Sequence, residues 1–83
     1  MTMDPQAITR LLIETLASNF RITKPITGKT VIIEDLALDS LTVMNLVMEI
    51  EDRLDVSVPL DRLADIRTID DLARCLAEEA AHR

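Results

Sequence analysis

The sequence predicts an all-α fold: a small antiparallel bundle of three long helices plus one short helix, with a long first loop. Apolar residues recur at helical spacing in three separate stretches of the chain. The core must be aliphatic, because 48% of the residues are hydrophobic and Phe20 is the only aromatic one, and this composition suits helices better than sheets. One glycine and three prolines leave few tight turns. A chain of 83 residues has room for one domain, spanning residues 1–83.

The first helix is predicted over about residues 5–18. Asp4 has the side chain of an N-cap, and Pro5 suits the first helical position, where the missing N–H loses no partner. The apolar face of this helix follows helical spacing and comprises Ile8, Leu11, Leu12 and Leu16. Thr15 falls outside that face, so we do not expect it in the core.

A long connection follows, over residues 19–39. Pro25 and Gly28 interrupt any regular element in it. The run Val31-Ile32-Ile33 is compatible with a short strand, but the chain offers no second strand to pair with it. We therefore expect one or two of these side chains to hold the loop against the helices, as a loop of this length in a compact domain requires.

The second helix is predicted over about residues 40–54. Asp39 is a good N-cap, which places Ser40 at the first helical position with a hydroxyl that the cap does not need. The core face of this helix follows helical spacing and comprises Val43, Leu46, Val47, Ile50 and Leu54.

A second apolar row on this helix, formed by Leu41, Met44 and Met48, begins beside Ser40. So short a chain can hardly bury a helix on every side, and methionine suits an adaptable binding surface. We interpret Met44 and Met48 as partly exposed contacts for a partner protein. The alternative is that one of them, Met48 rather than Met44, fills the core.

Acidic residues surround the far end of the same helix. Residues 34–61 contain eight acidic side chains and one basic side chain, Arg53. Glu49, Glu51 and Asp52 stand at the margin of the apolar row, an arrangement typical of a docking face for a basic, grooved partner. Such a field repels nucleic acid, so we expect no DNA or RNA binding. The alternative for any single acidic residue is that it only keeps the protein soluble.

Two further helices complete the predicted bundle. A short one, over about residues 61–65, is indicated by Leu60, Leu63 and Ile66. The last helix is predicted over about residues 69–80, because Thr68 and Asp71 have the spacing of a capping box. Its core face comprises Ile69, Leu72, Ala73, Leu76 and Ala80.

Residues that would carry catalysis are missing or misplaced. The only histidine, His82, lies in the C-terminal tail, so a nucleophile has no base on a rigid element. Cys75, the only cysteine, falls beside the core face of the last helix and is interpreted as a half-buried hydrophobic residue. Neither metal-ligand spacing nor a glycine-rich phosphate loop is present. We expect no metal site, and we expect that the protein is not an enzyme.

The same sequence features bear on location. A single cysteine permits no internal disulfide, which favours a reducing compartment. No apolar run reaches the roughly 18 residues of a membrane span, and the N-terminus lacks the pattern of a signal peptide. We therefore expect a cytoplasmic protein without a membrane span. We also expect it to be a monomer.

A family pattern begins just before the second helix, where residues 34–41 read Glu-Asp-Leu-Ala-Leu-Asp-Ser-Leu. This run resembles the attachment signature of the acyl carrier protein family, an acidic residue followed by Leu-Gly-x-Asp-Ser-Leu. The resemblance continues through the second helix to Pro59, and the start of the last helix also fits. It covers residues 30–78 well and the first helix by pattern only.

The resemblance implies that Ser40, flanked by Asp39 and Leu41, is esterified by 4′-phosphopantetheine, which a holo-carrier-protein synthase takes from coenzyme A. A phosphate at this position would lie over the positive end of the helix dipole. The thiol of the arm would carry an acyl group as a thioester between acyl-loading and acyl-transfer enzymes, sheltered between the helices. The residues implied to lie on or near the docking surface are Leu41, Met44, Glu49, Glu51, Asp52 and Ile66.

The chain also departs from the family pattern. Ala37 stands where the family has glycine, so we expect this turn not to use a positive φ. Thr42 and Asn45 replace common acidic residues, and Arg53 interrupts the acidic end of the helix. A carrier dedicated to a specialised lipid, a polyketide or an aminoacyl group is therefore as consistent with the sequence as one of primary fatty acid synthesis. A second hypothesis is an unmodified, carrier-like helical adaptor that binds partners through the same helix.

Overall fold

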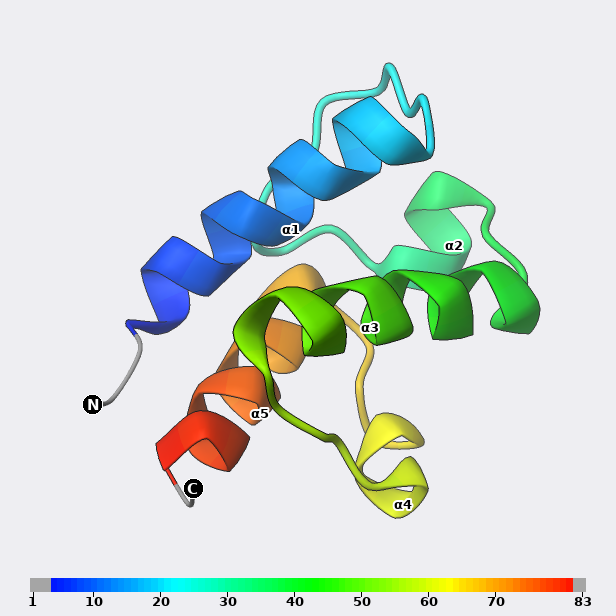
Figure 1. The fold of residues 1–83 in the computed structure, drawn as a ribbon. Coiled ribbons are helices and arrows are strands. Elements are labelled where there is room, and N and C mark those ends of the chain that lie inside the picture. The colour runs from blue at the N-terminus through cyan, green and yellow to red at the C-terminus, as the bar shows by residue number, and fades with distance from the viewer. Residues whose placement is uncertain (1–3, 82–83) are drawn as a thin grey trace.

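The computed structural model describes residues 4–81. Within this range it contains the helices α1 (Pro5–Asn19), α2 (Ile32–Leu36), α3 (Ser40–Leu54), α4 (Leu60–Leu63) and α5 (Ile69–Ala81). Figure 1 shows α1 along one side of the bundle and α4 on the side opposite to it. The predicted all-α bundle of three long helices is confirmed. The sequence interpretation of His82 concerns a residue outside the described range.

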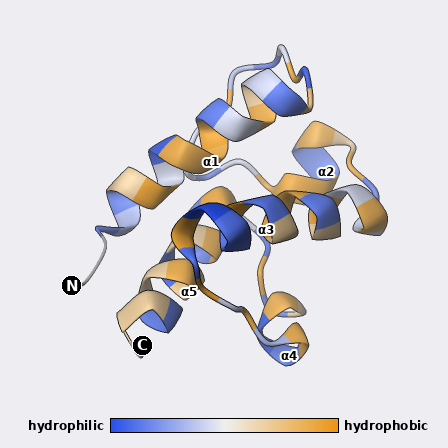
Figure 2. Cartoon of the chain, viewed as in Figure 1, coloured by the Kyte–Doolittle hydropathy of each residue, from blue (hydrophilic) through white to orange (hydrophobic). Residues whose placement is uncertain are grey.

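The core forms mainly where α1 and α5 face each other, and α3 covers it from a third side. The residues of α1 and α5 with no solvent exposure are Ile8, Leu12, Leu16, Ile69, Leu72, Ala73 and Leu76. From α3 the buried residues are Leu46, Val47 and Ile50. In Figure 2 hydrophobic and hydrophilic segments alternate along these three helices, as expected for helices that bury one face.

The start of α1 agrees with the sequence analysis. Asp4 caps the helix by accepting a hydrogen bond from the Gln6 N–H at 3.0 Å, and Pro5 is the first helical residue. Thr15 differs from the expectation, because its side chain is buried. Its hydroxyl donates to the carbonyl oxygen of Leu11 at 2.8 Å, so a threonine in this position is satisfied within its own helix and costs little to bury.

The structure also differs from the sequence analysis in the long connection, where α2 forms over five residues. Ile32 and Leu36, four positions apart, are both buried, whereas Ile33 is exposed. The Ile32 N–H donates to the carbonyl oxygen of Arg67 at 2.9 Å, and Val31 forms an isolated antiparallel bridge with Thr68 instead of a strand. The predicted anchoring of the loop is therefore confirmed for Ile32, but a single helical turn is too short to show periodicity in a sequence.

The start of α5 is fixed by the predicted capping box. Thr68 Oγ1 accepts from the Asp71 N–H at 3.1 Å, and Asp71 Oδ2 accepts from the N–H groups of Thr68 at 3.1 Å and Arg67 at 3.2 Å. The backbone hydrogen bond from Thr68 is the main reason why the pKa of Asp71 lies below its usual range. Nearby, Gly28 accepts from the Asp70 N–H at 2.8 Å, and a Cβ at Gly28 would overlap the Asp70 carboxylate.

The predicted helix boundaries hold closely. α3 matches its predicted range, and α1 and α5 each extend one residue further than expected. The short helix runs from Leu60 to Leu63. It begins at Leu60 because the N–H groups of Arg62 and Leu63 bond to the carbonyl oxygen of Pro59. The predicted range of about 61–65 was therefore too late. Within residues 4–81, none of the helices combines the length and the apolar character that a membrane-spanning segment needs.

Candidate functional site at the start of α3

Ser40 is the first residue of α3, and its side chain is exposed to solvent. Asp39 precedes it with extended backbone angles and caps the helix by accepting from the Thr42 N–H at 2.8 Å. The prediction that Asp39 caps the helix is confirmed. Because its carboxylate makes the cap, the cap does not require the Ser40 hydroxyl. The hydroxyl is therefore available to another group at a rigid helix start.

The backbone N–H groups at this helix start suit an anion, and the Asp39 carboxylate already occupies one of them. The first N–H groups of a helix have no intrahelical acceptors and carry the positive end of the helix dipole. Hydrogen bonding by Thr42, from its side chain and then from its backbone, holds the pKa of the exposed Asp39 carboxyl below its usual range. The cap therefore stays ionised and in place at neutral pH, while α3 has no other acidic residue in its first turn.

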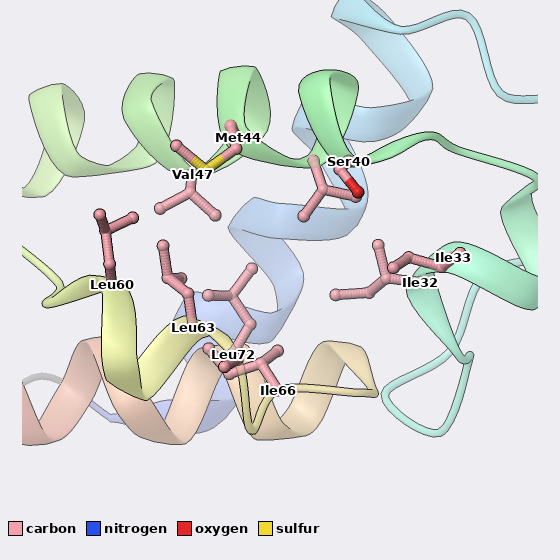
Figure 3. Close-up of a pocket in the computed structure, with 11 residues that line it drawn as sticks. Ile32, Ile33, Ser40, Met44, Val47, Leu60, Leu63, Ile66 and Leu72 are labelled. Atoms are coloured by element: carbon pink, nitrogen blue, oxygen red, sulfur yellow. The ribbon is translucent and has the colours of Figure 1, made fainter.

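An apolar pocket opens beside Ser40 (Figure 3). It has a volume of about 240 Å³ and lies between α2, α3, α4 and the start of α5. Ser40 provides the only polar side chain in its lining, which consists of Ile32, Ile33, Ser40, Val43, Met44, Val47, Leu60, Leu63, Ala64, Ile66 and Leu72. The site therefore joins one exposed hydroxyl to a hydrocarbon-lined cavity.

The turn between α2 and α3 contradicts one expectation. Ala37, at the C-cap of α2, has φ 54° and ψ 36°, so it adopts the left-handed conformation that was not expected for a residue with a side chain. A helix C-terminus often needs one residue in this conformation to turn the chain away. For alanine the conformation costs roughly 1–2 kcal/mol, and the buried residues on either side, Leu36 and half-buried Leu38, hold it in place.

The predicted apolar row of α3 is exposed. Leu41 is 70% exposed, Met48 57% and Met44 39%, so the alternative that Met48 fills the core is wrong. Ile33 and Leu60 are also exposed and line the same pocket. Ile33 and Leu60 could not be recognised as site residues from the sequence, because they lie on α2 and α4 and reach the pocket only through the fold.

The predicted acidic docking residues occupy different environments. Asp52 is exposed, and Glu49 is half-buried and pairs with Arg53 at 3.5 Å. Glu51 accepts a hydrogen bond from the Val58 N–H at 2.6 Å, so its carboxylate is engaged in holding the chain that follows α3. Ile66, also predicted near the docking surface, is half-buried and lines the pocket. A docking role for these residues stays a prediction.

Cys75 lies deeper than expected. Its side chain is buried in α5 rather than half-buried. Burial is the main cause that raises the pKa of its thiol above the usual range, partly offset by the positive charge of Arg62. A protonated, inaccessible thiol is a poor nucleophile, which agrees with its interpretation as a hydrophobic residue.

Comparisons with known proteins agree with this geometry. The chain matches the family model for a phosphopantetheine attachment site over residues 10–76. It is 34% identical over 80 residues to an acyl carrier protein of Syntrophobacter fumaroxidans, which covers 95% of this chain and 99% of that protein. It is 55% identical over 42 residues to a "Probable acyl carrier protein" of Caulobacter vibrioides, which covers 51% of this chain and 49% of that one. The solved structure of "a putative acyl carrier protein" from Mycobacterium tuberculosis superposes with a TM-score of 0.77 and 27% identity, covering 86% of this chain and 96% of that one.

The fold, the site and these matches define a small helical carrier domain with a phosphopantetheine attachment site. The chain belongs to the acyl carrier protein family. Its cofactor is covalently attached 4′-phosphopantetheine, and the family is one of carriers that interact with a phosphopantetheinyl transferase and with acyl-handling enzymes. An exposed hydroxyl at a helix N-terminus, beside a hydrocarbon-lined pocket, fits such a group.

Proposed function

We propose that this protein carries acyl intermediates as thioesters on a 4′-phosphopantetheine arm attached to Ser40. It delivers them, without catalysing reactions itself, between cytoplasmic enzymes of fatty acid, specialised lipid or polyketide biosynthesis. The observation that supports this proposal best is the position of Ser40. Its hydroxyl is exposed at the first residue of α3, Asp39 performs the capping, and the apolar pocket opens beside it.

The chain contributes attachment, orientation and shelter. Ser40 Oγ forms the phosphodiester bond, and the N-terminal end of α3 stabilises the negative charge of the phosphate. The arm supplies a terminal thiol that holds the acyl group as a thioester. The side chains of the pocket then remove the apolar part of the cargo from water.

The pocket favours an aliphatic cargo over an aminoacyl one. An amine or hydroxyl inside it would be desolvated without a partner, because Ser40 is the only polar side chain in the lining. A cavity of roughly 150 Å³ accommodates the six carbons of benzene, and this pocket has a volume of about 240 Å³. It therefore has room for a hydrocarbon segment of more than six carbons.

The exposed row of α3 is the proposed docking surface. Leu41, Met44 and Met48 present apolar area beside Ser40, while Glu49 and Asp52 provide negative charge further along the helix. Partners of matching chemistry are a holo-carrier-protein synthase and acyl-loading and acyl-transfer enzymes with basic docking surfaces. The apolar row lies nearer to Ser40 than the acidic residues do, so we expect apolar contacts to dominate close to the attachment point.

The test is enzymatic attachment of the arm. The purified protein is incubated with coenzyme A and a promiscuous phosphopantetheinyl transferase, and its intact mass is measured beside those of Ser40→Ala and Ser57→Ala. Ser57 is an exposed serine in the connection after α3, which makes it a matched control. We expect the parent and Ser57→Ala to gain the mass of one arm and Ser40→Ala to gain none.

Other outcomes distinguish the alternatives. Gain of the arm by Ser40→Ala would place the attachment site elsewhere. Failure of the folded parent to gain an arm, repeated with the transferase of its own organism, would contradict the carrier and leave an adaptor that binds partners through α3. The Ser40→Ala variant should remain folded in either case, because its hydroxyl is not needed for the cap.

A further inference from the structure

One wall of the apolar pocket is weakly attached to the rest of the molecule. That wall is α4, which has four residues and no buried side chain. Its residues Leu60 and Leu63, with Ala64 just after it, line the pocket opposite α3 (Figure 3). Leu60 is 69% exposed and Leu63 is only half-buried. Within α4 only Leu63 packs against the core, so apolar burial contributes little to holding this wall in place.

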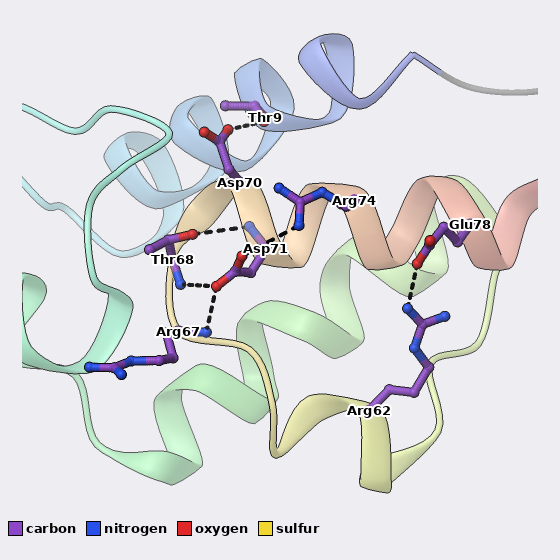
Figure 4. A network of polar contacts seen from close by, with 8 residues as sticks. All are labelled: Thr9, Arg62, Arg67, Thr68, Asp70, Asp71, Arg74 and Glu78. Atoms are coloured by element: carbon purple, nitrogen blue, oxygen red, sulfur yellow. Dashed lines mark hydrogen bonds and ion pairs between the residues drawn. The ribbon is translucent and has the colours of Figure 1, made fainter.

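Arg62 ties α4 to the last turns of α5. Its guanidinium donates from one nitrogen to Glu79 Oε2 at 2.9 Å and from the other to Glu78 Oε1. Figure 4 shows the Arg62 side chain reaching from α4 toward Glu78 on α5. A planar guanidinium that engages two carboxylates is more strongly fixed than a single exposed ion pair. It also offsets two negative charges near the C-terminal end of α5, where they are unfavourable.

The chain on either side of α4 is held separately. Before α4, the Val58 N–H donates to Glu51 of α3 at 2.6 Å. After α4, the N–H groups of Arg67 and Thr68 donate to Asp71 at the start of α5 (Figure 4). Both anchors lie outside α4, so they would hold α3 and the start of α5 in place if α4 were displaced.

We propose that Arg62 is a positioning residue that keeps the pocket closed over the acyl chain by holding α4 against Glu78 and Glu79. This inference rests on the proposed function, since it concerns the cargo of the arm on Ser40. Loss of the Arg62 contacts leaves α4 free to move outward, which exposes the cargo to water and to reagents. The residue acts through α4, because it lines the polar groove between α4 and α5 and not the apolar pocket.

The experiment measures how well the thioester is sheltered. The parent, Arg62→Gln and Arg74→Gln are loaded from octanoyl or acetyl coenzyme A with a promiscuous transferase, and loading is verified by intact mass. Thioester cleavage by hydroxylamine is then followed in each protein. Arg74 is a matched control, because it is an exposed arginine with one longer ion pair, 3.8 Å from Asp71.

We expect Arg62→Gln to speed cleavage of the octanoyl thioester roughly five-fold, with no change for Arg74→Gln. The acetyl thioester should be cleaved equally fast in all three proteins, because two carbons do not extend into the pocket. The double variant Glu78→Gln/Glu79→Gln, which retains the arginine and removes its carboxylate partners, should behave like Arg62→Gln. Added salt should raise the rate of octanoyl cleavage in the parent toward that of the variants, since it screens exposed charges.

Three outcomes would overturn the proposal. They are unchanged octanoyl cleavage in Arg62→Gln, equal acceleration of acetyl and octanoyl cleavage, and equal acceleration in Arg74→Gln. Failure of the parent to acquire any arm, which the mass measurement reveals before hydroxylamine is added, would overturn the proposed function together with this inference. Thermal unfolding of each variant tests whether the fold itself is kept.

Discussion

The two sides of this bundle differ in how they use their apolar residues. Between α1 and α5, large aliphatic side chains such as Leu12 and Leu76 have no solvent exposure. Around α3 and α4, by contrast, apolar side chains such as Leu41, Met48 and Leu60 remain more than half exposed, and a cavity separates the helices. Hydrophobic residues on the first side stabilise the fold, whereas those on the second side are available to a ligand or a partner.

This difference explains how so small a chain combines a stable fold with an open site. A domain of this size buries a limited share of its surface, so it cannot leave apolar area unpaired everywhere. Here the exposed large apolar residues of the described range lie on α2, α3 and α4, the helices that contribute most of the pocket lining. The α1–α5 interface can then remain closely packed while the other side is free to bind and release a ligand or a partner.

The largest expected effect on stability comes from truncating one leucine to alanine on each of the two sides of the bundle. Leu12→Ala should lower the free energy of unfolding by about 2–5 kcal/mol, because it leaves a cavity in a fully packed interface. Leu41→Ala should change it by less than about 0.5 kcal/mol, since the side chain is 70% exposed. Urea denaturation of both variants measures these changes.

In a functional assay, the substitution with the smaller effect on stability should have the larger effect on partner recognition. Leu41→Ala is expected to raise the KM of the transferase for the carrier, whereas Leu12→Ala should leave it unchanged at temperatures where that variant is folded. Similar losses of stability in the two variants would contradict the division between a stabilising side and a binding side.

A smaller effect is expected at the helix caps. Asp71→Ala removes the acceptor of two backbone N–H groups at the start of α5 and should cost about 1 kcal/mol. Asp39→Ala at the start of α3, where the carboxylate accepts from the Thr42 N–H and from the Thr42 side chain, should cost a similar amount. Thermal unfolding at neutral pH compares the two variants.

Acid should weaken both caps. Both carboxyls have a pKa lowered by hydrogen bonds in the folded state, so their stabilising effect is complete above the ordinary aspartate pKa of about 3.9. It is lost as the pH falls through their lower folded values. Below about pH 4 the parent should therefore lose stability more steeply than Asp71→Ala. Parallel curves for the two proteins would show that Asp71 does not contribute in this way.

The smallest expected effect concerns the turn before Ser40. Ala37→Gly should raise the free energy of unfolding by up to about 1 kcal/mol, because glycine adopts the left-handed conformation without a steric cost. Ala64→Gly is the matched control: Ala64 is an exposed alanine at the C-cap of α4 with φ −64°, where glycine should bring no gain. A loss of stability in Ala37→Gly would mean that flexibility in the unfolded chain outweighs the relief of strain.

Features that depend on local pattern could be predicted from the sequence. The caps at Asp4, Asp39 and Thr68–Asp71 depend on side chains that bond to backbone groups two or three residues away, so the sequence contains both partners. The three long helices have the length at which periodicity becomes visible. The exposure of Met44 and Met48 could be predicted because α3 has more apolar residues than one core face can hold.

Features that depend on distant contacts could not be predicted in this way. α2 is one turn long and is held by the Ile32 bond to Arg67, which lies far along the chain. The Arg62 contacts join residues 16 and 17 positions apart, and no spacing rule indicates them. The prediction for the backbone of Ala37 was wrong, because propensity describes the conformation that a residue prefers in isolation. In the folded chain, tertiary packing decides which conformation it adopts.

The burial of Cys75 has a consequence for the chemistry of the loaded protein. Thioesters exchange between thiols when a thiolate attacks, and disulfides form by oxidation of two accessible thiols. The chain has one cysteine, and it is buried with a raised pKa. Cys75 is therefore a poorer nucleophile than the thiol of the arm, so we expect acyl groups to stay on the arm and the arm to form no disulfide with Cys75.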